Sequence, residues 1–408
     1  MSLSRNQITI IPANVFDGLT SLTELYLYDN AITTIEQGAF SAFASSLLKL
    51  RIEGNGLKNY KDSTFEILIN LNELESDFPR ICCLVGDIEI CKPTDTFASC
   101  KDLLKREVLR VLMFLIGISS VIGNVIVIIS RCYEKDDNSG NINSSAKKVQ
   151  NTLITNLAVS DLLMAIYLII IASADVHYRG RYWVVAKDWK DSFLCSFSGA
   201  VSTLSGEFSV FTLMVMSVDR AVNIVNPFST RRLNRKYCRI LIGFAWLVFF
   251  VLSFLPVVHK LNFIDIPYFG DNYYGKQSVC LALPLTRSRW PGWEYAVAIF
   301  VVFNGIGFIV IAVSYATIFF SVQRSGATVC RRRKRKEQLK MARKLGIIVF
   351  TDFCCWFPII LMSFCSEMGW WDIPEEIYVW AATFIIPINS SVNPYLFTIV
   401  YMCTCKHK

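Results

Sequence analysis

Histidine is scarce in this sequence, and clusters of the kind that catalysis or metal binding requires are missing. The 408 residues include three histidines, His177, His259 and His407, which are far apart along the chain. No group of His, Cys, Asp and Glu has the spacing of a metal site or a catalytic centre. We therefore expect neither an enzyme nor a bound metal, and the sequence indicates no cofactor.

Long apolar stretches dominate the composition. Hydrophobic residues make up 53% of the chain and the mean hydropathy is +0.42, above ordinary globular values. The excess lies after residue 107, in seven stretches that are each long enough to cross a bilayer as a helix of about 20 residues. They are residues 108–130, 151–173, 196–218, 238–258, 294–320, 345–366 and 376–400. The sequence therefore predicts a mainly α membrane protein, with a seven-transmembrane helix bundle in residues 108–401.

Lysine and arginine gather in alternate loops between these stretches. They are Arg131, Lys135, Lys147 and Lys148 in the first loop, Arg220, Arg231, Arg232, Arg235 and Lys236 in the third, and Arg331 to Lys336 in the fifth. The last even-numbered loop, residues 367–376, has neither Lys nor Arg. Because cytoplasmic loops carry the excess of positive charge, we expect a multi-pass plasma-membrane protein with an extracellular N-terminus and a short cytoplasmic tail, residues 402–408.

The basic block 331–336 has a second interpretation as a nucleic-acid patch. Because it lies between two spans, we expect it to anchor the loop near the anionic lipids of the bilayer instead. No nucleic-acid partner is therefore expected.

Leucines recur in residues 1–78 with a period of 24–25. The run from Leu22 to Asn30, L-x-x-L-x-L-x-x-N, is followed by a copy from Leu47 to Asn55. This pattern predicts an α/β leucine-rich-repeat solenoid, in which each unit is a short strand with a return segment. The asparagine is expected to satisfy backbone groups at the turn. Since about three repeats are the minimum for a stable stack and Met1 to Ile11 is no signal peptide, we expect an N-terminally truncated solenoid fragment.

Exposed strand positions of such repeats line a concave face that binds ligands. The candidates here are Glu24, Tyr26, Tyr28, Arg51 and Glu53. For each of them an ordinary solvated surface is the alternative.

Six of the fourteen cysteines lie in the portions predicted to be outside: Cys82, Cys83, Cys91, Cys100, Cys195 and Cys280. An even number in an oxidising compartment indicates disulfides. The first four form a Cys-rich hinge, residues 79–107. Neighbouring cysteines seldom pair with each other, which leaves either 82–91 with 83–100 or 82–100 with 83–91.

One carboxyl group interrupts the otherwise uncharged stretch 345–366. A central Asp352 costs about 2.5–3.5 kcal/mol on the scale of insertion experiments, so it indicates a function. A polar residue satisfied within the bundle, with no switching role, is the alternative. We expect its partners to be Asn389 and Asn393, which lie four residues apart on one helical face.

Single polar residues and prolines mark the other spans in a fixed order. They are Gly123-Asn124; Ser160-Asp161; Glu207, Ser209 and Asp219-Arg220; Trp246; Tyr315; Asp352, Trp356 and Pro358; and Asn389, Asn393, Pro394 and Tyr395. This set resembles the rhodopsin-like G-protein-coupled receptors. Pro358 and Pro394 would kink their helices and free carbonyl groups for neighbours.

The resemblance implies roles for these residues. It implies an activation switch in which Arg220, beside Asp219, is held at rest and is released when the sixth span swings out; a plain surface ion pair is the alternative. Asn124, Asp161 and Ser209 would form a polar core, which in this family often holds a sodium ion. The resemblance also implies a disulfide between Cys195 and Cys280.

Phe350-Thr351-Asp352 and Glu207 narrow the resemblance to the leucine-rich-repeat-containing receptors, as does Gly307 where most families have proline. The segments 178–182 and 268–276 are similar to the relaxin family peptide receptors in particular.

This resemblance implies that a secreted peptide or protein hormone, first a relaxin/insulin-like peptide, binds the repeats. The receptor would then signal through a heterotrimeric G protein, by analogy the stimulatory G protein that raises cyclic AMP. One alternative is a receptor for a cystine-knot ligand of the glycoprotein-hormone type. Another is an adhesion or pattern-recognition protein anchored by its helices, although seven spans with a polar core exceed what an anchor needs. A retinal protein is excluded because residues 376–400 contain no Lys.

Overall fold

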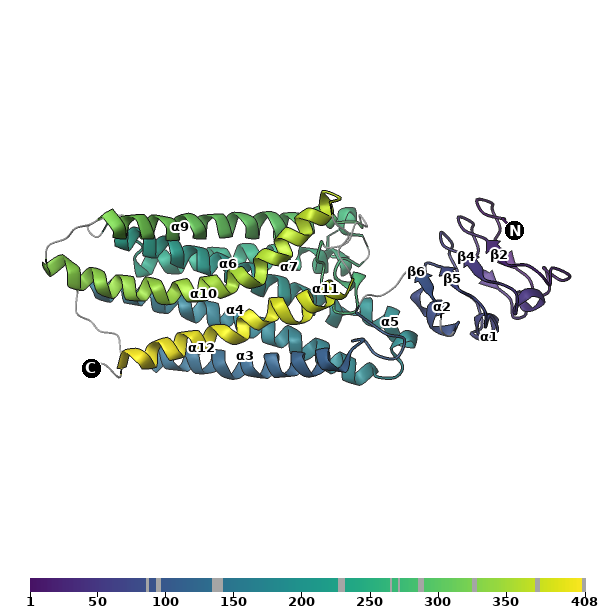
Figure 1. The fold of residues 1–408 in the computed structure, drawn as a ribbon, viewed down its shortest axis with the longest axis horizontal. Helices are drawn as coiled ribbons and strands as arrows, with labels where there is room; N and C mark the ends of the chain where they lie inside the picture. The colour runs from purple at the N-terminus through teal and green to yellow at the C-terminus, as the bar shows by residue number, and fades with distance from the viewer. Residues whose placement is uncertain are drawn as a thin grey trace. The chain divides into compact units, whose positions relative to one another are not determined.

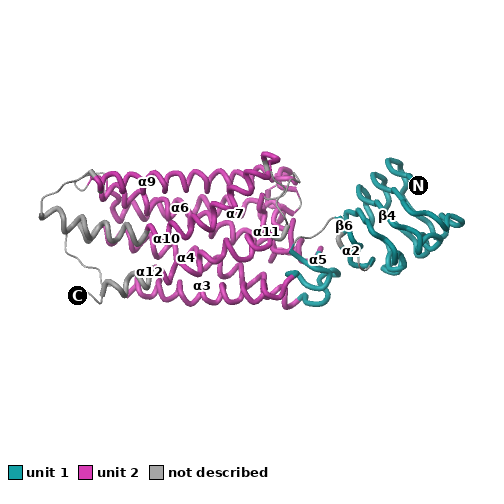
Figure 2. Tube along the Cα trace, viewed as in Figure 1, with its two compact units in different colours: residues 1–105, 178–186 teal, residues 106–177, 187–408 magenta. Residues whose placement is uncertain are grey.

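The computed structural model describes residues 1–85, 88–92, 97–133, 142–226, 232–264, 266–270, 272–284, 290–324, 329–370 and 375–405. The chain divides into two compact units (Figure 2). One contains residues 1–105 and 178–186, and the other contains residues 106–177 and 187–408. The segment 178–186, which follows the second predicted span, therefore belongs to the unit that holds the repeats.

Parallel strands stack in the first unit, one from each successive repeat (Figure 1). The four-stranded sheet has the order β2 (Glu24–Tyr26), β4 (Lys49–Arg51), β5 (Glu73–Glu75) and β6 (Ile90–Lys92). A smaller parallel pair joins β1 (Ile10–Ile11) to β3 (Thr34–Ile35). The other elements are η1 (Ser41–Phe43), α1 (Ser63–Glu66) and α2 (Pro79–Leu84).

The leucine period produces the core of this unit. Leu25, Leu50 and Leu74 are aligned in register across the sheet, and all three are fully buried. Phe40 and Phe65, one from each of two return segments, pack edge to face behind them with ring centroids 5.9 Å apart.

The repeat asparagines satisfy the backbone at the turns, as the sequence predicted. The Asn55 side-chain amide donates to the carbonyl groups of Leu27 (3.0 Å) and Ile52 (2.9 Å). Its side-chain oxygen accepts from the amide of Ile32 at 3.0 Å. Asn30 makes the same contacts one repeat earlier. Each asparagine thus joins adjacent repeats as well as closing its own turn.

Two disulfides tie the hinge together. They are Cys82–Cys91 and Cys83–Cys100, the first of the two arrangements that the sequence left open. Cys91 lies in β6, so the hinge contributes the last strand of the sheet.

The segment 178–186 docks onto this hinge within the first unit. The backbone amides of Tyr182 and Trp183 donate to the carbonyl groups of Lys101 (3.2 Å) and Cys100 (3.1 Å). The Arg80 guanidinium lies 5.2 Å from the centre of the Trp183 ring. Both residues belong to α5 (Tyr182–Lys190), and the boundary between the units falls inside this helix, after Ala186.

Long helices run side by side in the second unit (Figure 1). They are α3 (Glu107–Tyr133), α4 (Ile142–Tyr178), α6 (Phe193–Val225), α7 (Arg235–Lys260), α9 (Asn304–Arg324), α10 (Val329–Glu367) and α12 (Ile386–Cys405). The shorter elements are η2 (Pro267–Phe269), η3 (Tyr274–Lys276), α8 (Trp293–Ala296), the π-helix η4 (Val297–Phe303), α11 (Glu375–Trp380) and the π-helix η5 (Ala381–Ile385). Helix α6 packs against α7, α9 and α10, while α3 packs against α12.

In the part of the chain that the structure describes, 6 helices are long and apolar enough to cross a membrane. They correspond to the first six predicted spans, and α11, η5 and α12 together cover the seventh, 376–400. Of the predicted tail, residues 402–405 continue α12, and residues 406–408 lie outside the described ranges. Helix α6 begins near Cys195 and ends near Arg220, so the two ends of the bundle are named here the Cys195 end and the Arg220 end.

Candidate functional site: a buried polar network

Asp352 has a partner on the last helix. The Asn389 side-chain amide of α12 donates a hydrogen bond to the Asp352 carboxyl group of α10, and both side chains are buried. Asn393, which the sequence also nominated for Asp352, instead donates to Asp161 of α4 at 3.0 Å. Two asparagines one turn apart therefore connect α12 to two different carboxyl groups.

Asp161 of α4 accepts hydrogen bonds from side chains on two other helices. It accepts from Ser209 of α6 at 3.2 Å as well as from Asn393. Ser209 is also 3.0 Å from the hydroxyl of Ser160. Asp161 and Ser209, two of the three residues expected in the polar core, are therefore in contact, whereas Asn124 of α3 donates to the backbone of α12 instead.

Pro394 explains the place of Asn124. Proline lacks the N–H that would bond the carbonyl four residues earlier, which is the carbonyl of Ser390. That carbonyl accepts instead from the Asn124 side chain (3.0 Å) and from the Ser120 hydroxyl (3.2 Å), both on α3. Gly123 allows α3 to lie this close to α12, because a Cβ atom at residue 123 would lie 2.5 Å from Pro394 Cγ.

The Asp219–Arg220 pair is buried near the end of α6, so it is not a plain surface ion pair. Arg220 is 2% exposed, and its guanidinium lies 3.2 Å from the Asp219 carboxylate. Asn223 donates to the other Asp219 oxygen at 3.0 Å. Tyr315 of α9 packs against a small buried cluster of Ala221, Ile224 and Ile318, which begins at the residue after this pair.

The interior at the Cys195 end is filled by the loop that follows η3. The disulfide Cys195–Cys280, which the resemblance implied, fastens this loop to α6. Residues 279–283 are buried, with exposed fractions of 0–5%. Trp356 of α10, Leu281 and Leu283 border a remaining cavity of about 10 Å³, which is at the lower limit for a single water molecule.

Three aromatic side chains hold this loop. Tyr167 of α4 donates to the carbonyl of Val279 at 3.0 Å, and the Trp189 indole of α5 donates to the carbonyl of Ser278 at 2.8 Å. Tyr274 donates to the backbone of α7 at 2.7 Å. Burial raises the pKa of the neighbouring Tyr273 hydroxyl well above 10.0.

Asn304 is a network residue that the sequence reasoning missed. Its side-chain amide donates to Glu207 of α6 at 3.2 Å, and both side chains are buried. Asn304 follows directly on the π-helix η4, which forms here without a proline. The one amide side chain inside the apolar stretch 294–320 was the signal that could have identified it.

A buried ion pair was also missed. Arg110 of α3 donates through Nε to the carboxylate of Asp175 of α4, and these residues are 8% and 0% exposed. Arg110 lies inside the predicted span 108–130, so its charge at membrane depth was the signal that could have identified this ion pair.

The ligand-binding candidates of the repeats share the polar face of the sheet. The Tyr26 hydroxyl donates to Glu24 at 2.8 Å, and this hydrogen bond raises the pKa of Tyr26 above 10.0. The Arg51 guanidinium lies 4.9 Å from the centre of the Tyr28 ring and also pairs with Glu53. All five predicted residues thus lie together, in a surface of alternating charge and aromatic rings.

These features together define a multi-pass membrane receptor: apolar helices around a buried polar network, with leucine-rich repeats beside them in the chain. A model of the 7 transmembrane receptor (rhodopsin family) matches residues 123–397, and a leucine rich repeat model matches residues 1–57. The chain belongs to the rhodopsin family of seven-transmembrane receptors. It is a plasma-membrane receptor and not an enzyme, as the sequence predicted.

Similar proteins show where in the rhodopsin family this chain belongs. The G-protein coupled receptor GRL101 of Lymnaea stagnalis is 41% identical over 333 residues, which are 81% of this chain and 28% of that protein. Relaxin receptor 1 of Mus musculus is 34% identical over 337 residues, 81% of this chain and 42% of that protein. The follicle-stimulating hormone receptor of Cairina moschata is 28% identical over 339 residues, 83% of this chain and 45% of that protein. The chain spans less than half the length of these relatives.

Proposed function

We propose that the chain is part of a receptor for a secreted peptide or protein hormone that binds the repeats and signals through a heterotrimeric G protein. Similarity to relaxin receptor 1 supports a relaxin/insulin-like peptide as the first ligand class. The stimulatory G protein and cyclic AMP are the first coupling to test, by analogy alone.

The orientation of the bundle is part of this proposal. Basic residues in the odd loops support a cytoplasmic Arg220 end and an extracellular Cys195 end with the N-terminus outside. Two of those residues, Lys135 and Arg231, lie outside the described ranges, as do the side chains of 331–336.

The observation that carries the proposal is the loop 279–283 inside the bundle. Because Leu281 and Leu283 are buried and border one small cavity with Trp356, the loop itself reaches the interior near Trp356, and a hormone is not required to enter the helices. The face of the sheet with Tyr26, Tyr28 and Arg51 offers a broad surface of aromatic rings and charges, which suits a folded peptide.

Helix α5 supplies a route from the repeats to the switch. Its first turn is anchored to the hinge through Trp183, and Trp189 near its end holds the loop at Ser278. A shift of α5 would therefore move the loop whose Leu281 and Leu283 border one cavity with Trp356. The contact of Asp352 with Asn389 would hold α10 against α12 at rest, and its release would free Arg220 for the G protein.

We also propose an allosteric sodium ion beside Asp161. The Asp161 carboxyl group, the Ser209 hydroxyl and the buried Asn393 side-chain oxygen, which has no hydrogen-bond partner among the described residues, fit a small cation. Such an ion would supply positive charge that favours the resting arrangement of α4 and α12.

Ligand-dependent nucleotide exchange tests the proposal. Membranes with the full receptor are exposed to relaxin/insulin-like peptides, and exchange is measured on each class of G protein. We expect a response that Arg220→Ala abolishes while peptide binding persists. No peptide-dependent exchange on any G protein would contradict the signalling role.

A cystine-knot hormone is the second candidate ligand, because the follicle-stimulating hormone receptor is also a relative. The same assay distinguishes the two, since only one ligand class should stimulate exchange.

A further inference from the structure

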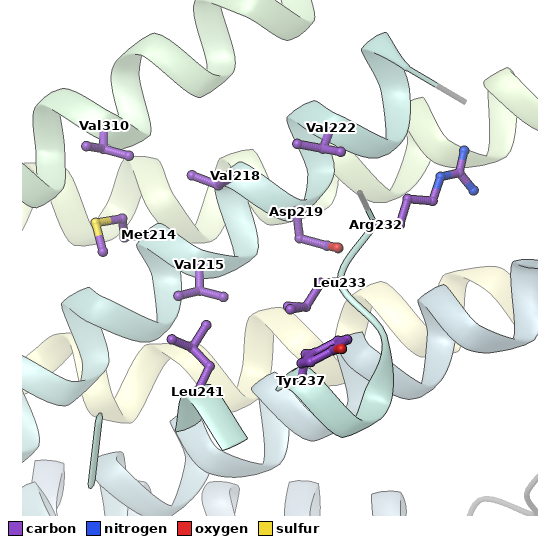
Figure 3. Close-up of a pocket in the computed structure, with 10 residues that line it drawn as sticks. All are labelled: Met214, Val215, Val218, Asp219, Val222, Arg232, Leu233, Tyr237, Leu241 and Val310. Carbon is purple, nitrogen blue, oxygen red and sulfur yellow. The ribbon is translucent and has the colours of Figure 1, made fainter. Parts of the chain in front are cut away.

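A cleft of about 520 Å³ lies near the Arg220 end of the bundle (Figure 3). It is bordered by Met214, Val215, Val218, Asp219 and Val222 of α6, Arg232, Leu233, Tyr237 and Leu241 of α7 and the segment before it, and Val310 of α9. Its volume is within the roughly 300–1,000 Å³ that is typical of small-molecule sites. Asp219 and Arg232 are the charged residues of its lining, and the other lining residues are mostly apolar.

The shape of the cleft suits a chain that enters from the lipid. Val218 and Tyr237 are 40% and 64% exposed, so the cleft opens away from the bundle. Met214 and Val222 are eight residues apart, which corresponds to about 12 Å along α6. That length fits within one leaflet of a hydrocarbon core about 30 Å thick.

Only one end of the cleft is polar. Figure 3 shows Arg232 at this end, its guanidinium extending away from the valines of α6. Asp219 contributes the one acidic group of the lining. Its charge is compensated by Arg220 at 3.2 Å, by a hydrogen bond from Asn223 and by the nearby positive charge of Arg232.

The surrounding sequence is strongly basic. Arg232, Arg235, Lys236 and Arg239 follow one another closely, and the sequence has no Asp or Glu from residue 220 to residue 264. An apolar cleft with a cation, Arg232, at one end and further basic residues nearby in the sequence is complementary to an anionic amphiphile.

We propose that this cleft binds one acyl chain of an anionic glycerophospholipid of the cytoplasmic leaflet, with its phosphate group at Arg232. The assignment of the lipid to the cytoplasmic leaflet rests on the proposed orientation, which places the Arg220 end at the cytoplasm. A bound chain would join α6, α7 and α9 beside the Asp219–Arg220 pair. An uncharged sterol would make no use of the cations, so the anionic lipid fits better.

Native mass spectrometry of the purified full chain tests the site without any signalling assay. The protein is equilibrated in detergent with equal amounts of phosphatidylserine and phosphatidylcholine, and the retained lipids are counted. We expect one retained phosphatidylserine. Arg232→Gln should lower the preference for phosphatidylserine by about fivefold, while Lys236→Gln, an equal charge change at an exposed residue outside the lining, should leave it intact.

A second pair of variants tests the apolar part. Val218→Trp fills the cleft and should abolish lipid retention, whereas Val225→Trp, on the same helix and 36% exposed, should not. Unchanged retention in both Val218→Trp and Arg232→Gln would overturn the site. Equal losses in Arg232→Gln and Lys236→Gln would indicate surface attraction alone, and retention of added cholesterol in place of phosphatidylserine would also overturn it. Because binding is measured directly, failure of the hormone proposal leaves this result interpretable.

Discussion

Asn389 donates its side-chain hydrogen bond to Asp352, and this contact joins α12 to α10 in the middle of the bundle. One turn further along α12, Asn393 makes the equivalent contact with Asp161 of α4. Because both contacts are buried, a displacement of α10 must break or replace the first while the second can persist. The network is thus arranged so that α10 can move independently of α4.

Loss of the Arg110–Asp175 ion pair is expected to destabilise the bundle strongly. Arg110→Ala removes the guanidinium that pairs with the buried Asp175 carboxylate, a change that costs about 3–5 kcal/mol. Thermal unfolding of the purified receptor measures this as a lowered melting temperature. The double variant Arg110→Ala/Asp175→Ala should recover part of the loss, since no buried charge then remains uncompensated. A double variant that is less stable than Arg110→Ala would contradict this explanation.

Gly123→Ala is expected to separate α3 from α12. The added Cβ atom would lie 2.5 Å from Pro394 Cγ and 2.9 Å from its Cβ, so the helices must shift at a cost of about 1–3 kcal/mol. Gly243→Ala is the matched control, because nothing lies within 4 Å of a Cβ atom there, and it should stabilise α7 slightly. Equal melting temperatures for the two variants would show that the close approach is unimportant.

Trp189→Phe tests the proposed route through α5. The substitution keeps the ring and removes the indole N–H that holds Ser278. We expect peptide binding to persist and the maximal G-protein response to fall. Trp370→Phe, at a residue that is 73% exposed, should change neither. A full response in Trp189→Phe would rule out this contact as the coupling element.

Periodic features of the fold were predictable from the sequence. Leu25, Leu50 and Leu74 recur at the repeat period, so their alignment and burial followed directly, as did the role of Asn55. Pro394 likewise predicted that a carbonyl group on α12 would need a donor from a neighbouring helix. These cases depend on local geometry that the residue type determines.

Contacts that depend on the rotation and depth of whole helices were harder to predict from the sequence. Asn389 and Asn393 share one face of α12, so spacing alone could not tell which one reaches Asp352. The choice between the two hinge disulfides depends on how α2 lies against β6. Neither the docking of residues 178–186 on the hinge nor the burial of residues 279–283 has a periodic signal, because the first segment includes only the start of the short helix α5 and the second lies in a loop.

The central claim is that the contact between Asp352 and Asn389 holds the resting state. A hydrogen bond of this kind contributes about 1–3 kcal/mol, so its loss shifts the equilibrium at least about fivefold toward the active state. Ser363→Ala, which changes another buried polar residue of α10, should leave basal output unchanged. The most direct measurement is ligand-free G-protein nucleotide exchange by Asp352→Ala at surface expression equal to that of the unmodified receptor. We predict raised basal exchange. Unchanged or lower exchange would contradict the claim that the contact between Asp352 and Asn389 holds the resting state, and Asp352 would then have a structural role alone.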